Sequence, residues 1–480
     1  MSLKRLNRSL VETPVLPEKV LQFGEGNFLR AFVNWCIDTM NKKGLLNAGV
    51  VVVQPIEQGL VEMLNEQDGL YTLYLNGIKK GEAVSEHQVI DCITRGLNPY
   101  SQFAEYLKTA ENPEMEFVIS NTTEAGIAFK GEKPTSGETP ESFPGKLTAW
   151  LNHRFEFFKG AEDKGVTIIP CELINHNGKM LKEYILKYAD HWQLSHDFKK
   201  WIEESCSFYN TLVDRIVPGY PREKAAELCD QLGYEDKLIV EGEQFHLWVI
   251  EGSETIKERF PADIAGLNVI FTDNQAPYRS RKVRILNGAH TSMVPVGLLA
   301  GEETVKNVLD NEQLTQFIEN AIFNEIVPTL DLSLNELNTF ANEVLDRFRN
   351  PYIKHFLLSI SLNSHAKYNT RILPSVIEFQ KRRGKLPIKL VFALAALIQL
   401  FRDKEGKFTG LLKDDKEVLD LYQEMKGNNI TDYSAIVEKV FGLDSVWNGS
   451  LNKISGLKDM VVDYLKAIDE NGIEKALNEI

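Results

Sequence analysis

The chain has 480 residues, of which 43% are hydrophobic and 25% are charged, a composition typical of a soluble globular protein with enough length for two domains. The formal net charge is −14, which argues against nucleic acid or an anionic membrane as the main partner, because both attract positive charge. The first ten residues are polar and basic, and the longest apolar run, residues 390–401, is too short to span a bilayer. We therefore expect a cytoplasmic protein that binds neither nucleic acid nor membrane.

The cysteines give no sign of a disulfide framework or a zinc site. They are odd in number and widely spaced, and no two form a C-x-x-C pair. This pattern is typical of a reducing compartment, and we expect no metal site; the oligomeric state stays open. The five cysteines are Cys36, Cys92, Cys171, Cys206 and Cys229.

Short β-rich runs alternate with helical stretches in the first half of the chain. Three of the runs are almost wholly apolar or β-branched, as strands buried on both faces of a parallel sheet should be. We therefore predict an α/β fold, with a Rossmann-type doubly wound domain over residues 1–275. The predicted strands are residues 15–23, 49–54, 115–120, 166–172, 237–240 and 267–272.

The pattern changes after about residue 274, where a turn-forming stretch is followed by long helical periods with few strand candidates. This indicates a mainly α-helical domain over residues 276–480, and we expect an active site, if there is one, to lie in the cleft between the two domains. The helical periods are residues 303–326, 334–348, 386–402 and 457–468.

The first strand runs directly into a glycine turn. Gly24 and Gly26 precede an amphipathic helix that extends toward Met40, and such a turn lets the backbone approach a pyrophosphate at a helix N-terminus. The fingerprint is incomplete, because Leu29 replaces its third glycine and Gln54 stands where an acidic residue would bind the ribose. An ordinary strand-to-helix turn remains an equal alternative.

Two later strands end in small polar residues, at 120–126 and 171–178. An open α/β sheet places its ligand crevice at such strand ends, so these segments support a dinucleotide site. Each residue among them could equally be a helix cap or a turn residue.

Residues 278–291 contain the candidate catalytic residues. If this segment is helical, about 100° per residue places Lys282, Asn287 and His290 within an arc of about 140°. Their side chains could then converge on one cleft. The spacing alone also permits a surface lysine, a cap asparagine and a core histidine.

The arrangement Lys282-x4-Asn287-x2-His290 resembles the signature of the mannitol dehydrogenase family of polyol-specific long-chain dehydrogenases, and the resemblance covers nearly the whole chain. It implies a metal-independent reaction with NAD, in which Lys282 is the acid/base, Asn287 stabilises the alkoxide and His290 holds a neighbouring hydroxyl. The cofactor-binding residues that we expect are Phe23, Gly24, Gly26, Asn27, Phe28, Gln54, Thr122, Thr123 and Glu124.

Within this family, residues 120–127 and 170–174 are most similar to the branch that reversibly reduces D-tagaturonate to D-altronate in hexuronate catabolism. Glu172-Leu173 stands where mannitol 2-dehydrogenases and fructuronate reductases are expected to carry Asp-Asn. This departure removes one candidate oxyanion asparagine and leaves Asn177 as its possible substitute in substrate binding.

A sugar-acid substrate also carries a carboxylate, which needs a cation in this acidic protein. The candidates are Lys367 and Arg371, which a helix would place on one face at i and i+4; two solvated helix cations are the alternative. Reduction of fructuronate or fructose, or a non-catalytic sensor of nucleotides or sugar acids, are the competing functions.

Overall fold

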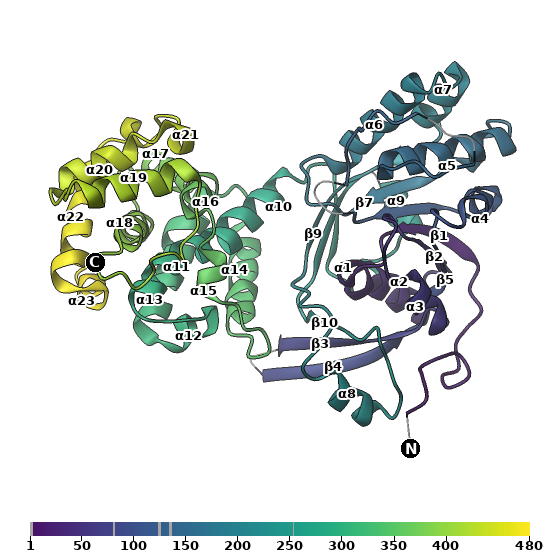
Figure 1. Ribbon diagram of the computed structural model, residues 1–480, viewed down its shortest axis with the longest axis horizontal. Helices are drawn as coiled ribbons and strands as arrows, with labels where there is room; N and C mark the ends of the chain where they lie inside the picture. The colour runs from purple at the N-terminus through teal and green to yellow at the C-terminus, as the bar shows by residue number, and fades with distance from the viewer. Residues whose placement is uncertain (1–2, 80–81, 123–125, 134–136, 253) are drawn as a thin grey trace. The chain divides into compact units, whose positions relative to one another are not determined.

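The computed structural model describes residues 3–79, 82–122, 126–133, 137–252 and 254–480. It consists of two compact units, whose elements are labelled in Figure 1. Unit 1 contains the chain up to Asn76 and Val84–Gln275, and unit 2 contains Gly77–Ala83 and Ala276–Ile480. In the described part of the chain, no helix has the length and apolar character needed to cross a membrane.

Unit 1 is built on a six-stranded sheet in which every neighbouring pair is parallel, with strand order β5-β2-β1-β6-β7-β8. Numbered along the chain within the sheet, this order is 3-2-1-4-5-6, the arrangement of dinucleotide-binding Rossmann domains. The strand order reverses between β1 and β6, so a ligand crevice is expected there. The strands are β1 (Glu18–Phe23), β2 (Gly49–Val53), β5 (Ile93–Leu97), β6 (Phe117–Ser120), β7 (Thr167–Pro170) and β8 (Ser207–Phe208).

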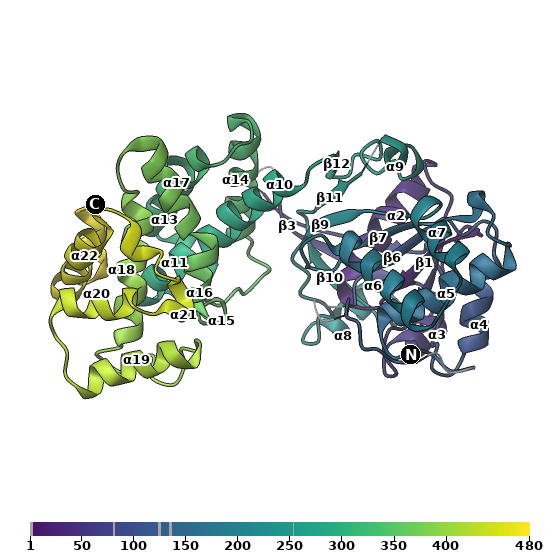
Figure 2. The same cartoon turned by 90° about the horizontal axis from the view of Figure 1, so that it is seen from above.

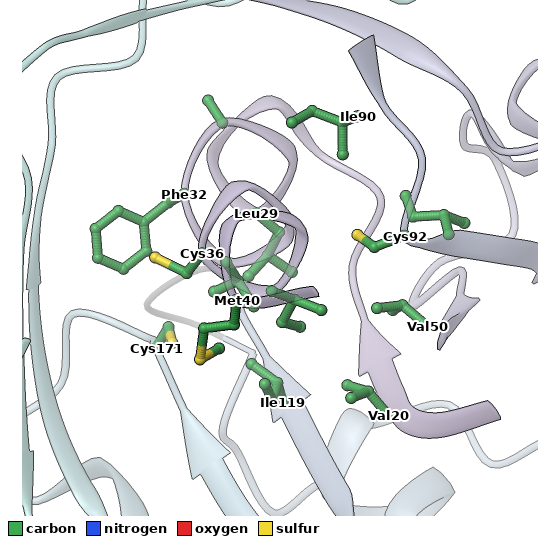
Figure 3. Close-up of a cluster of buried hydrophobic side chains, with 14 of the residues drawn as sticks. Val20, Leu29, Phe32, Cys36, Met40, Val50, Ile90, Cys92, Ile119 and Cys171 are labelled. Carbon is green, nitrogen blue, oxygen red and sulfur yellow. The ribbon is translucent and has the colours of Figure 1, made fainter. Parts of the chain in front are cut away.

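The central strands form because their side chains are apolar on both faces. In β2, Val50 and Val52 join a core that contains Leu29 and Cys36, shown in Figure 3. Val51 and Val53 point into a second core on the opposite face of the sheet. All five residues of β2 are buried. This double burial explains why an unbroken apolar run was a reliable strand signal.

Helices cover both faces of this sheet (Figure 1). Those of unit 1 are α1 (Asn27–Ala31), α2 (Val33–Lys42), α3 (Val61–Glu66), α4 (Phe103–Lys108), α5 (Phe143–Phe157), α6 (Asn177–His191), α7 (His196–Glu204), α8 (Ala225–Leu232) and α9 (Glu254–Arg259). Two three-stranded sheets, with the orders β10-β3-β4 and β12-β11-β9, lie mostly in unit 1. Their strands are β3 (Tyr71–Lys79), β4 (Glu82–Ile90), β9 (Asn210–Asp214), β10 (Val240–Glu243), β11 (Leu247–Glu251) and β12 (Val269–Thr272).

Unit 2 is helical (Figure 2). Its central helix is α18 (Ile388–Arg402), which is buried along most of its length and packs against α11 (Gly288–Leu299) and α22 (Leu457–Asn471). The other helices are α10 (Ala276–Arg281), α12 (Val305–Asp310), α13 (Glu312–Asn320), α14 (Leu334–Phe348), α15 (Leu357–Ile360), α16 (Ser364–Arg371), α17 (Leu373–Arg383), α19 (Lys416–Gly427), α20 (Tyr433–Phe441), α21 (Asp444–Trp447) and α23 (Ile473–Asn478). Two π-helical turns, η3 (Lys282–Asn287) and η4 (Ala321–Ile326), adjoin α11 and α13.

The predicted α/β fold class is confirmed, but two predicted helices are wrong in detail. The helix expected from Gly26 toward Met40 is broken at Phe32, whose φ of −126° and ψ of −74° separate α1 from α2. Residues 303–326 form α12, α13 and η4 rather than one helix. The break between α12 and α13 occurs at Asn311, because its side chain accepts a hydrogen bond from the Leu314 N–H and so begins a new helix.

Candidate active site

The glycine turn lies at the point where the strand order of the parallel sheet reverses. The Gly24 N–H donates to the Val53 carbonyl at 3.0 Å, and the Asn121 N–H donates to the Phe23 carbonyl at 3.1 Å. Gly24 has a φ of +117°, and a Cβ there would lie 2.9 Å from both the Asn121 carbonyl oxygen and the Leu29 side chain. Only glycine fits this position.

Gly26 has a different reason to be glycine. It is exposed, it caps the N-terminus of α1, and its φ of −66° suits any residue. A Cβ built at Gly26 meets no described atom within 4 Å. The space beside this backbone is therefore open at the carboxyl ends of β1 and β6, which fits the close approach of a dinucleotide pyrophosphate.

The other expected cofactor residues near this turn are mostly engaged within the protein. Phe23 is fully buried, with its ring 4.8 Å from that of Phe143, and Phe28 is half-buried and stacks on Phe32 at 5.2 Å. The Asn27 side chain accepts a hydrogen bond from Arg30 at 2.6 Å. Phe23 is thus placed as a core residue, whereas Phe28 and Asn27 are partly accessible.

Gln54 is 3% exposed, and its amide group donates to the carbonyls of Ile56 and Glu57 at 2.9 and 2.8 Å. Its side chain therefore shapes the turn after β2 and has both N–H groups occupied. Thr123 and Glu124 lie outside the described residues.

Thr122 is tied to the end of β7 through a buried carboxyl group. Glu172, 2% exposed, accepts hydrogen bonds from the Thr122 N–H, the Thr122 hydroxyl and the Ser120 hydroxyl, each at 3.0 Å. Burial raises the pKa of Glu172, while these hydrogen bonds act in the opposite direction. Glu172 consequently fixes the backbone after β6.

Asn177 is fully buried at the start of α6. Its amide nitrogen donates to the carbonyls of Pro170 and Glu172, both at 3.0 Å, and its oxygen accepts from the N–H groups of Gly178 and Thr211. No polar atom of this side chain remains for a ligand, so we do not include Asn177 among the substrate-binding residues that we propose.

The segment of the candidate catalytic residues is not a continuous α-helix as expected. It consists of α10, the π-helical turn η3 and α11. A π-turn links residue i to residue i+5, which returns residues five apart to about the same side. Lys282 and Asn287 occupy the first and last positions of η3, so they lie closer in direction than an α-helix would place them. π-turns occur frequently at functional sites.

His290 is buried on α11, and its Nε2 atom has no hydrogen-bond partner among the described residues. Burial lowers the pKa of this imidazole well below its ordinary value, and His355, Arg347, Arg371 and Lys367 lower it further. The ring is therefore neutral near pH 7. An unpartnered buried imidazole nitrogen is costly, which fits a group whose partner is a ligand.

Lys367 and Arg371 lie on α16, which packs against both η3 and α11. Both are half-buried, and neither forms an ion pair with a described carboxylate. Lys367 donates to the Ile360 carbonyl at 2.8 Å. Burial lowers the pKa of both groups, and Arg371 adds to the effect at Lys367. Unit 2 thus brings these cations close to His290.

Two further residues of this cluster, Arg347 and His355, were missed in the sequence. Arg347 is buried near the end of α14, and His355 lies between α14 and α15. Neither belongs to a motif, and periodicity carries no information about His355 because it lies outside a helix. In the described part of the chain, no group of three or more His, Cys, Asp or Glu residues could hold a metal ion.

The fold defines a class of two-unit proteins, in which a Rossmann-type domain is joined to a helical domain. The Rossmann domain of mannitol dehydrogenase matches residues 18–263, and the C-terminal domain of mannitol dehydrogenase matches residues 274–469. The chain therefore belongs to the mannitol dehydrogenase family.

Three relatives that match along the full length share the name altronate oxidoreductase. The chain is 46% identical over 480 residues to an altronate oxidoreductase of Phocaeicola vulgatus, with all of both chains covered. It is 45% identical over 478 residues to altronate oxidoreductase of Bacillus subtilis, covering 99% of this chain and 98% of the relative. The same name belongs to an Escherichia coli O7:K1 relative that is 45% identical over 482 residues, with both chains fully covered.

Two solved structures share the fold. D-sorbitol dehydrogenase in substrate-free form is 22% identical with a TM-score of 0.81, covering 98% of this chain and 100% of the other. Mannitol 2-dehydrogenase of Pseudomonas fluorescens, solved with NAD and D-mannitol, is 21% identical with a TM-score of 0.68, covering 99% of each chain.

Proposed function

We propose that this protein is an NAD-dependent oxidoreductase that reversibly reduces D-tagaturonate to D-altronate. The reaction is supported by 45–46% identity to altronate oxidoreductases along the whole chain. The proposal of a sugar-acid substrate rests on two half-buried cations, Lys367 and Arg371, which lie near His290. Neither cation has an ion-pair partner among the described residues. Such cations suit a carboxylate, whereas a neutral polyol does not require a cation.

In the proposed reaction the cofactor and each site residue of unit 2 have a separate role. NAD, when bound at the Gly24–Gly26 turn in its reduced form, supplies the hydride that reduces the keto carbon. Lys282 donates a proton to the carbonyl oxygen, and Asn287 donates a hydrogen bond to the negative charge that develops there. The neutral His290 holds a neighbouring hydroxyl through its free Nε2 atom. Lys367 and Arg371 bind the carboxylate and so orient the substrate.

The predicted cleft between the domains remains a prediction, as do the individual roles of these residues. We further propose a cytoplasmic location, which is supported by five free, buried cysteines. The partner that this function requires is a small sugar-acid molecule.

The test follows the loss of NADH absorbance with purified protein and tagaturonate, fructuronate or fructose in parallel. We expect preference for tagaturonate, and a fall in kcat of about 10²–10⁴-fold in Lys282→Ala, the usual effect of losing a general acid. Lys306→Ala, which removes an exposed lysine paired with Asp310, is the matched control. Preference for fructose or fructuronate would assign a related substrate, and NADH binding without turnover would indicate a sensor.

A further inference from the structure

Glu25 stands between the two glycines of the turn after β1. Its carboxyl group reaches the turn that follows β2, where the Leu60 N–H donates to Glu25 Oε1 at 3.4 Å. A Cβ built at Gly59 in that turn would overlap Glu25 Oε1 and would lie 2.6 Å from Gln54 Oε1. The Glu25 carboxylate and the Gln54 side chain therefore lie next to each other at the carboxyl end of β2.

This is the place where a dinucleotide-binding domain carries the acidic residue that binds the adenosine ribose. Gln54 occupies that position in the sequence, but it brings no charge, and its amide nitrogen donates to two backbone carbonyls. Glu25 brings a carboxylate to the same place from the neighbouring turn. The structure thus contains the negative charge that the sequence fingerprint lacks at Gln54.

The protein holds the Glu25 carboxylate only loosely. Its hydrogen bond to Leu60 is long, and no described residue forms an ion pair with it. Burial raises the pKa of this carboxyl group, whereas backbone hydrogen bonds and the charge of Arg30 act in the opposite direction. Glu25 is 9% exposed, and Gly26 and Gly59 beside it are exposed. A ligand at this turn can therefore approach the carboxylate.

The described residues around this carboxylate offer little positive charge to a phosphate. Residues 54–60 contain no lysine or arginine, and Glu57 adds an exposed carboxylate. Arg30 is 2% exposed, and its guanidinium donates to two backbone carbonyls and an asparagine. Lys146, which is linked to this turn through the Tyr100 hydroxyl, is fully buried. The 2′-phosphate that distinguishes NADP from NAD would thus meet negative charge here without an accessible cation.

We propose that Glu25 determines the preference of this enzyme for NAD over NADP. Its carboxylate accepts a hydrogen bond from a hydroxyl group of the adenosine ribose and repels a phosphate at the 2′ position. The inference rests on the cofactor use in the proposed function and extends it to a specificity-determining residue. Glu25 takes no part in hydride or proton transfer, so its substitution should change cofactor binding.

The test is a fluorescence titration of the full-length protein with NADH and, separately, with NADPH. We expect the unaltered protein to bind NADH more tightly. Glu25→Gln, which removes the charge but keeps the shape, should weaken NADH binding, strengthen NADPH binding and reduce the ratio of the two Kd values about tenfold or more, the usual scale of a hydrogen bond to a charged group. Glu25→Asp, which keeps the charge, should retain most of the preference. Glu57→Gln, which removes an exposed carboxylate of the same turn, is the matched control.

Equal affinity of the unaltered protein for NADH and NADPH would overturn the inference, whether or not the variants fold. An unchanged ratio of Kd values in Glu25→Gln, equal weakening of both cofactors, or the same change in Glu57→Gln would also overturn it. In each of these cases, turnover of tagaturonate with NADH by the unaltered protein would still uphold the proposed function. If the unaltered protein bound neither NADH nor NADPH, both the inference and the proposed function would be wrong.

Discussion

At the scale of single residues, the two glycines after β1 illustrate how similar residues can serve different purposes. The fold requires glycine at position 24, because φ is positive there and a Cβ would lie too close to the Asn121 carbonyl oxygen. Gly26 has an ordinary φ and open space around it. We therefore expect a substitution of Gly24 to affect folding and a substitution of Gly26 to affect cofactor binding.

This difference can be measured by comparing Gly24→Ala with Gly26→Ala. We expect Gly24→Ala to lower the unfolding free energy by about 1–3 kcal/mol, because alanine is strained at this φ. Gly26→Ala should leave thermal unfolding nearly unchanged but weaken NADH binding in a fluorescence titration. Equal effects of the two variants on both properties would contradict this division.

His246 provides a residue-scale prediction about pH. Its Nε2 atom accepts a hydrogen bond from the Asn268 N–H at 2.8 Å, and burial, with the nearby Arg215 charge, lowers its pKa from 6.5 to about 3. The imidazole is thus neutral in the folded protein but takes up a proton in the unfolded chain below pH 6.5. Its stabilising contribution is complete above pH 6.5 and is lost as the pH falls toward 3.

We therefore expect the unfolding free energy of the protein, relative to His246→Gln, to fall by about 1.4 kcal/mol per pH unit between pH 6 and 4. Urea denaturation at several pH values measures this slope. His196→Gln, which removes an exposed histidine, controls for the loss of an imidazole. If the unfolding free energies of the protein and of His246→Gln changed with pH in parallel, the His246 imidazole would be protonated as readily in the folded protein as in the unfolded chain.

At the scale of elements, the start of α12 combines two reciprocal hydrogen bonds. The Thr304 hydroxyl accepts from the Asn307 N–H at 3.1 Å, while the Asn307 side chain accepts from the Thr304 N–H at 3.2 Å. We expect Thr304→Ala to lower the unfolding free energy by about 1 kcal/mol. Asn307→Ala should cost less in the Thr304→Ala background than alone, because the two bonds form one capping box.

Chemical denaturation of the two single variants and the double variant gives this coupling. Ser333→Ala, which removes the simpler cap of α14, provides a reference without a reciprocal bond. Additive effects of Thr304→Ala and Asn307→Ala on the unfolding free energy would mean that the two hydrogen bonds act independently.

Element type was predictable where one pattern dominated, as in the apolar strands β2 and β6 and in α14, whose bounds match the expected helix. The π-turn η3 was not, because a period of 3.6 residues is assumed whenever a helix is inferred from apolar spacing. The long strands β3 and β4 were also missed. Most described side chains of β4 are exposed or half-buried, so that strand lacks the apolar run that marked the others.

At the scale of the whole molecule, the family and the two-part architecture could be predicted because the motifs occur in order along the chain. The surroundings of individual site residues could not. The Asn177 side chain is hydrogen-bonded to Thr211, which is 34 residues away. The His290 ring contacts that of His355, which comes from a distant segment. Such contacts follow from tertiary packing, which carries no local signature.

The free cysteines are distributed unevenly in the molecule. All five lie in unit 1 and are buried, and unit 2 contains none. Burial raises the pKa of Cys36 and Cys206 to about 12, so the thiolates that react with alkylating reagents are scarce in the folded state. The rate of thiol labelling therefore reports the opening of unit 1 alone, and its comparison with the unfolding of the whole chain shows whether the two units unfold together or one after the other.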